Sequence, residues 1–116
     1  MAFDEYLAER IRIYLKQQQV SFTKKMMIGG IAFMVNDKMC VGVVKKSLMA
    51  RIDPVIYEIL LKKKGCRVMD FTGRPMKGYV FVDSPGTEMD ADLAYWVDLA
   101  LEYNPKAKSS KKSRKS

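Results

Sequence analysis

The 116-residue sequence contains no histidine and only two cysteines, and these absences exclude several kinds of chemistry. Without an imidazole there is no histidine acid–base catalyst, no Ser-His or Cys-His nucleophile pair and no histidine metal ligand. Cys40 and Cys66 are too few for a disulfide framework and lack C-x-x-C spacing, which favours free thiols in a reducing compartment. Two isolated cysteines cannot complete a structural zinc site. We therefore expect no metal centre.

A glycine-rich cofactor loop is also missing. Gly29 and Gly30 are adjacent, but the residues around them match neither G-x-x-x-x-G-K-[ST] nor G-x-G-x-x-G. A β-bulge or a tight bend is the better explanation of this pair. Without such a loop, and without an acid placed after one, the sequence predicts no cofactor and no catalytic residue, so we do not expect an enzyme.

No apolar run approaches the roughly 20 residues that are needed to cross a bilayer. Residues 1–12 alternate charged and apolar side chains, which is unlike a signal peptide. The sequence therefore predicts a soluble, cytoplasmic protein that does not enter a membrane.

The positive charge is concentrated at the C-terminal end. The net charge is +8, but six of the 21 Lys and Arg lie in residues 105–116, which contain no acid. Residues 1–104 therefore hold 15 cations and 13 acids, a net charge of only +2. We expect a single domain over residues 1–104 and a disordered basic tail over 105–116, because the tail has no large apolar side chain to bury. The tail is either a solvated end or a sequence-independent attractor of nucleic acid.

Apolar periodicity and turn residues predict an α+β fold. The first helix has an apolar face at helical spacing, formed by Phe3, Leu7, Ile11 and Tyr14. Asn36 and Asp37 separate two apolar runs and indicate a two-residue hairpin turn. The predicted elements are a helix over 3–17, three or four strands within 20–28, 31–35, 38–44 and 48–52, a helix over 54–64, strands over 66–69 and 79–82, and a helix from 89 that stops before 105. Strands joined mostly by hairpins, with three helices, predict a two-layer domain on a largely antiparallel sheet.

Capping residues mark the ends of the later helices. Asp53 is suited to the N-cap and Pro54 to the first position of the second helix. Residues 62–65 (KKKG) indicate its end, where lysines complement the helix dipole and glycine reverses the chain. Thr87 and Asp90 resemble a capping box at the start of the third helix. The apolar face of that helix is predicted from residues that recur at a spacing of three to four, namely Met89, Leu93, Trp96, Val97, Ala100 and Leu101.

Residues 69–83 (MDFTGRPMKGYVFVD) form the most informative stretch. Gly73 and Pro75 indicate a loop that cannot be helical, and the aromatic and β-branched run at 79–82 indicates a buried strand. Backbone requirements explain the glycines and the proline, but they do not explain Arg74 and Lys77. These two cations are therefore candidate binding residues.

Lys25 and Arg51 complete the set of candidate binding residues. Strand alternation places Arg51 away from the face that carries Leu48 and Ala50, and hence away from the helix-covered side. Methionine is also abundant in the sheet half of the chain, at Met26, Met27, Met34, Met39, Met49, Met69 and Met76. Methionines fill irregular gaps in cores, and they also form adaptable partner surfaces.

Three motifs resemble the N-terminal domain of the TfoX (Sxy) competence-regulator family. They are KMMIGGIAFMVNDKMC at 25–40, LMARIDP at 48–54 and MDFTGRPMKG at 69–78. The resemblance covers the chain from about Phe3 through the helix that contains Trp96. It implies a stand-alone TfoX N-terminal domain with an α-β-β-β-α-β-β-α order similar to secretion chaperones, and a link to transcriptional regulation of competence.

Two functions are consistent with these observations. The first is a non-enzymatic interaction module that binds a protein partner, or itself, through a sheet face or an edge strand. The second is a nucleic-acid-binding protein that uses a basic patch of Lys25, Arg51, Arg74 and Lys77 together with the lysine-rich tail.

Overall fold

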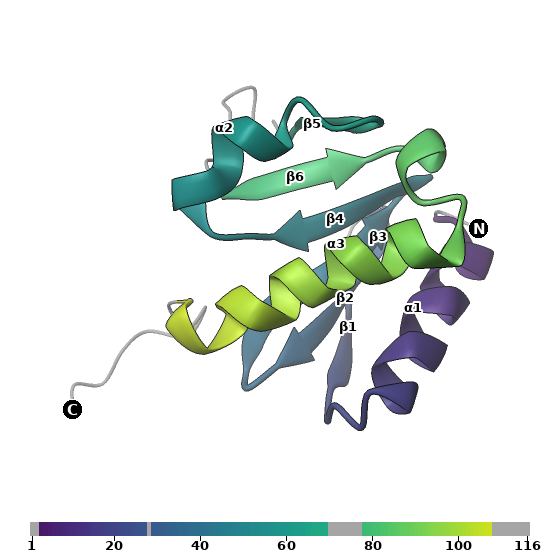
Figure 1. Cartoon of the computed structure of the whole chain (residues 1–116). Helices are drawn as coiled ribbons and strands as arrows, with labels where there is room; N and C mark the ends of the chain where they lie inside the picture. Colours follow the sequence, from purple (N-terminus) through teal and green to yellow (C-terminus); the bar gives the residue numbers. More distant parts are fainter. Residues whose placement is uncertain (1–2, 28, 70–77, 108–116) are drawn as a thin grey trace.

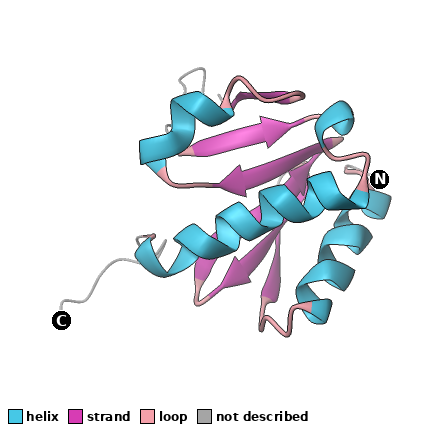
Figure 2. Cartoon of the chain, viewed as in Figure 1, coloured by secondary structure: helices cyan, strands magenta, loops and turns pink. Residues whose placement is uncertain are grey.

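The structure is a computed structural model that describes residues 3–27, 29–69 and 78–107. Within these ranges six strands form one sheet in the order β1-β2-β3-β4-β6-β5, and all neighbouring pairs are antiparallel. The helices lie over one face of this sheet, with α3 crossing its middle and α1 beside it (Figure 1). Figure 2 shows this helical layer in cyan and the strands in magenta.

The elements in chain order are α1 (Glu5–Gln17), β1 (Thr23–Met27), β2 (Gly30–Val35), β3 (Lys38–Val44), β4 (Ser47–Arg51), α2 (Tyr57–Leu60), β5 (Cys66–Val68), β6 (Tyr79–Val82) and α3 (Asp90–Tyr103). Short 3₁₀ helices occur at Pro54–Ile56, Ser84–Gly86 and Asn104–Lys106. The predicted α+β class on an antiparallel sheet is confirmed. Four strands precede α2, one more than the resemblance implied.

Helix α1 starts and packs as its sequence predicts. The Asp4 carboxylate accepts a hydrogen bond from the Leu7 backbone N at 3.0 Å and so caps the first turn. The buried face of the helix consists of Leu7, Ala8, Ile11 and Leu15. Phe3 and Tyr14 are partly buried against the same core. This apolar face holds α1 on the sheet.

The second helix is shorter than predicted. Asp53 caps it as expected, because its carboxylate accepts a hydrogen bond from the Val55 backbone N at 2.9 Å. However, a 3₁₀ turn leads into an α-helix of only four residues, which ends at Leu60. Residues 62–64 therefore lie in the turn that follows, and the predicted placement of these lysines in the last helical turn is wrong.

The α-helical bonds end early because the backbone N atoms of Lys62 and Lys63 donate to the carbonyls of Ile59 and Leu60, three residues back. A close contact between two glycines then fixes the turn into β5. Gly65 has a φ of +80°, and a Cβ added to it would lie 2.8 Å from the backbone N of Gly86 and 2.9 Å from the carbonyl O of Asp83. The Asp83 backbone N also donates to the Gly65 carbonyl at 2.8 Å. The chain must turn at Gly65 to make this approach, so no helix can continue through this residue.

Helix α3 begins later than its sequence suggests. Met89 is the N-cap and no side chain bonds to the first turn. Thr87 is buried, with 3% of its surface exposed, just before the helix. The predicted capping box of Thr87 and Asp90 is therefore wrong, and Met89 is 66% exposed instead of facing the core. The buried face consists of Leu93, Trp96, Val97 and Ala100, which the periodicity predicted.

The β2–β3 hairpin has the predicted two-residue turn. Side-chain hydrogen bonds that the sequence did not predict also connect this hairpin to the end of α3. Asn36 and Asp37 have φ values of +56° and +63°, which are typical of a type I′ turn. Asn104, just after α3, donates from its side chain to the Val35 carbonyl at 3.1 Å and accepts from Asn36 Nδ2 at 2.9 Å. Lys38 Nζ donates to the Asn104 carbonyl at 3.1 Å. The end of α3 is thus fixed to the hairpin.

The first residues of the predicted tail are ordered beside this contact between α3 and the hairpin. The 3₁₀ helix continues to Lys106, and Ala107 is only 5% exposed. Residues 108–116 lie outside the described residues, so their predicted disorder remains a prediction.

The sheet has a helix-covered face and a helix-free face. The helix-covered face carries the main core, with side chains from the strands that include Ile31, Phe33, Val41, Val43, Leu48, Ala50, Val80 and Val82, and with Ile52 just after β4. On the helix-free face, Val44, Met49, Met69 and Phe81 form a second buried cluster. A Cβ added to Gly42 would lie 2.8 Å from Met49 Cε, so this methionine fills the space above the glycine.

Candidate interaction surfaces

The structure places two of the four candidate binding residues. Lys25 in β1 and Arg51 in β4 both lie on the helix-free face, as strand alternation predicted for Arg51. Strands β2 and β3 lie between them, which corresponds to about 14 Å at ordinary strand spacing. The Arg51 guanidinium lies 5.4 Å from the centroid of the Tyr79 ring. Arg74 and Lys77 lie outside the described residues. The described part of the chain therefore does not bring these cations into one site.

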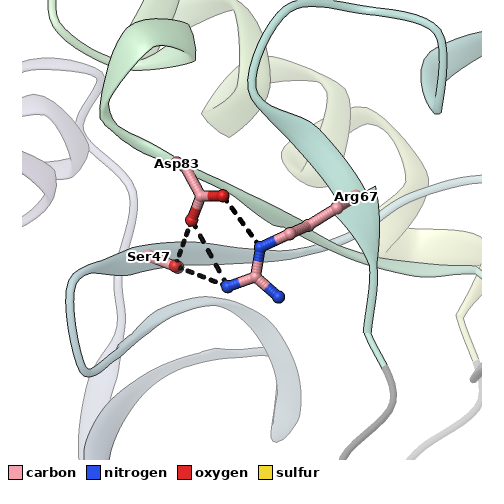
Figure 3. Close-up of polar contacts among 3 residues, drawn as sticks. All are labelled: Ser47, Arg67 and Asp83. Carbon is pink, nitrogen blue, oxygen red and sulfur yellow. Dashed lines mark hydrogen bonds and ion pairs between the residues drawn. The ribbon is translucent and has the colours of Figure 1, made fainter.

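Three polar side chains connect β4, β5 and the residue that follows β6 (Figure 3). Strand alternation from Met49 and Phe81 places them on the helix-free face. Ser47 Oγ donates to Asp83 Oδ1 at 2.6 Å, and Arg67 Nε donates to Asp83 Oδ2 at 2.8 Å. Arg67 Nη2 also donates to Ser47 Oγ at 3.1 Å. The hydrogen bond from Arg67, with a further contribution from Ser47, lowers the pKa of Asp83 although partial burial opposes it. We call this set the Ser47–Arg67–Asp83 network.

The hydrogen bonds of this network hold β4, β5 and the end of β6 together. A hydroxyl beside a carboxylate resembles a nucleophile with its base, but Asp83 is engaged by Arg67, and a carboxylate with a lowered pKa is a weak base. The cysteines are no better as nucleophiles. Both are free, as predicted, and burial raises the pKa of Cys40 to about 12 and that of Cys66 to about 11. Their thiols are protonated at neutral pH and therefore unreactive.

Strand β1 forms one edge of the sheet, and its residues 23–26 are exposed. The direction of its backbone groups follows from two glycines in the neighbouring strands. A Cβ added to Gly42 would meet the Ile31 carbonyl oxygen, and one added to Gly30 would meet the Val43 carbonyl oxygen. The backbone groups of Ile31 and Val43 therefore point toward each other across β2 and β3, as in a hydrogen-bonded antiparallel pair.

Alternation along the strands extends this assignment to β1. Ala32, next to Ile31, directs its backbone groups to the opposite side and pairs with Lys25 in an unbroken register. Lys24 and Met26 flank Lys25, so they direct their N–H and C=O groups outward. No strand in the described part of the chain lies against this edge. Four backbone groups are thus available to an added strand.

A basic groove lies beside the same edge, between α1 and β1. Its volume is about 450 Å³, and it is lined by Arg12, Lys16, Val20, Ser21, Phe22 and Lys24. The lining contains three cations, two large apolar side chains and no acid. Arg12 Nε donates to Glu9 Oε1 at 2.9 Å, and this contact lowers the pKa of Glu9. Phe22 packs edge-on against the core residue Phe33, with ring centroids 5.5 Å apart, which fixes the apolar wall.

Sequence reasoning did not identify this groove. Lys25 was selected without its neighbour Lys24, and no binding role was assigned to Arg12 and Lys16. A usable signal was present, because two consecutive lysines in a strand must point to opposite faces. One of them therefore had to lie on the side that α1 covers.

The described residues contain no group of three or more His, Cys, Asp or Glu side chains that could hold a metal ion. No helix in the same ranges is both long enough and apolar enough to cross a membrane.

Comparison with known protein families gives a match over most of the chain. The model of the TfoX N-terminal domain matches residues 14–103, a range that contains all six strands and α3. No curated protein and no solved structure matches the chain.

Proposed function

Because the chain belongs to the TfoX N-terminal domain family, we propose that it is a regulatory domain that acts by binding a protein partner along β1 and not by catalysis. The regulation is transcriptional and linked to natural competence, as the resemblance of its motifs to that family implies. The observation that carries the proposal is the free edge of β1, where Lys24 and Met26 offer backbone groups to an added strand.

The chemistry of the remaining side chains supports a binding role. The Ser47–Arg67–Asp83 network is internally satisfied, and both thiols have raised pKa values. The second buried cluster closes much of the helix-free face, since Met49 is 1% and Phe81 is 7% exposed. The β1 edge is therefore the more accessible part of the sheet for a partner.

A proline substitution at the edge tests this proposal. Met26→Pro removes one outward N–H without breaking a bond to β2, whereas Met26→Ala keeps that N–H and serves as the matched control. Crosslinking pull-downs from an extract of the source cell should recover the same partner with the wild type and with Met26→Ala, but not with Met26→Pro. Thermal unfolding of all three proteins checks that the fold is intact. Recovery of the partner by folded Met26→Pro would contradict the proposal.

Nucleic-acid binding is the alternative, and a salt titration separates it from protein binding. The full chain and a chain of residues 1–107 are compared on the same duplex DNA and the same single-stranded RNA. Binding only by the full chain, with a steep salt dependence, reports the charge of the tail. Binding by residues 1–107 that weakens in Arg51→Ala would instead show a nucleic-acid site on the folded body.

A further inference from the structure

We infer that the partner segment on β1 is an extended acidic peptide, an inference that rests on the proposed function. A strand added to β1 would form its backbone hydrogen bonds with Lys24 and Met26. Every second side chain of that strand would then project over the groove between α1 and β1. The side chains at these positions determine which peptides fit.

The charge of the groove selects acidic side chains at those alternate positions. Lys16 approaches from the end of α1 and Lys24 from β1, and both side chains are exposed. Neither forms an ion pair with the described residues, although Lys24 lies near enough to Glu9 to contribute to the lowered pKa of that carboxyl. Arg12 is held in place by Glu9, so it adds a fixed cation at the rim. Carboxylates spaced two residues apart in an extended peptide would meet these cations, and an apolar side chain of the same face would pack on the wall formed by Val20 and Phe22.

The same lysines disfavour a second copy of this chain as the occupant. A copy paired antiparallel edge to edge would keep its helices on the same face and bring its own Arg12, Lys16 and Lys24 to the junction. Six cations would then gather beside one another, and of these only the two Arg12 side chains have an acid partner in the ion pairs of the structure, the Glu9 of their own copy. Lysines on an edge strand are a common protection against such pairing. The positive charge at the β1 edge therefore disfavours pairing with a second copy of the chain and favours a strand of opposite charge.

Two labelled peptides test the inference by fluorescence anisotropy with the full chain. One alternates Thr or Val with Glu, so that all its acids lie on one face of a strand, and its twin has Gln at every Glu position. We expect the Glu peptide to bind at least tenfold more tightly than the Gln peptide. The double variant Lys16→Glu, Lys24→Glu should weaken the Glu peptide about tenfold or more, because each reversal replaces an attraction with a repulsion.

The matched control is the double variant Lys62→Glu, Lys64→Glu, which changes the net charge equally in the turn before β5, at the other end of the strand order. It should change the affinity less than twofold. Met26→Pro should abolish binding of the Glu peptide, and hydrogen exchange should show that the amides of Lys24 and Met26 become protected in the complex.

Each of the other outcomes overturns the inference. If both peptides bind alike and Met26→Pro blocks both, β1 remains a docking edge and only the acidic specificity is lost. If the Glu peptide binds Met26→Pro unchanged, the groove attracts charge without adding a strand. A dimer in light scattering that Met26→Pro dissociates would identify a second copy as the occupant. If neither peptide binds, the acidic strand is not the ligand, and the partner recovered in the pull-down is recognised by other chemistry.

Discussion

Removal of the Asn104 side chain should measurably destabilise the fold. Asn104 is 3% exposed, and its amide donates to the carbonyl of Val35, a residue that is 7% exposed. In Asn104→Ala this buried acceptor loses a partner, at a cost of about 1–3 kcal/mol. The second bond of Asn104 goes to Asn36, which is exposed and can turn to water instead. We therefore expect the free energy of unfolding to fall by about 1–3 kcal/mol.

Urea unfolding followed by fluorescence measures this change, because Trp96 is the only tryptophan and is 2% exposed in the same helix. The matched control is Asn36→Gly, which removes the Asn36–Asn104 bond while glycine keeps the φ of +56° accessible. This control should lose about 1 kcal/mol, less than Asn104→Ala, because it removes only one of the two hydrogen bonds of the Asn104 side chain, and that bond is part-buried. The reasoning is refuted if Asn104→Ala stays within about 0.5 kcal/mol of the wild type, or if Asn36→Gly costs more than Asn104→Ala.

Two further predictions concern pH. The contact with Arg67 and Ser47 lowers the pKa of Asp83, so it stabilises the fold above pH 3.8 and this stabilisation is lost as the pH falls. Asp83→Asn should lower the free energy of unfolding by about 1 kcal/mol at pH 7, and the difference should shrink toward pH 3 in urea titrations. Burial and the hydrogen bond to Asp98 raise the pKa of Tyr14 to about 12, so the wild type should lose stability between pH 10 and pH 12 as the unfolded chain ionises. Tyr14→Phe should lose less over that range, and equal slopes for the two proteins would contradict this prediction.

The features that the sequence predicts correctly depend on residues that are close together in the chain. The face of α1 follows from helical spacing, and the type I′ turn follows from the tolerance of Asn36 and Asp37 for a positive φ. The outward direction of Arg51 follows from the two-residue period of a strand. Each of these is decided within a few residues, so local chemistry is sufficient.

The errors come from contacts between distant segments. The chain turns where Gly65 approaches Gly86, which lies 21 residues further along, and Thr87 is buried by packing instead of capping α3. The candidate site was incomplete for the same reason. Lys24 and Lys25 were visible in the sequence, but only the order of the strands shows that β1 is an edge and that α1 forms a basic groove beside it.

The position of β6 between β4 and β5 has a consequence for the order of folding. Strands β1 to β4 are joined by short connections and can assemble by local zipping, whereas the pairing of Leu48 with Val82 must close a loop of 33 intervening residues. In the described part of the sheet, β5 pairs only with β6. Strand β5 therefore cannot join the sheet before β6 does. Strands β1 to β4 form a meander that can fold early. Strands β5 and β6 join later, and the attachment of β5 depends on β6.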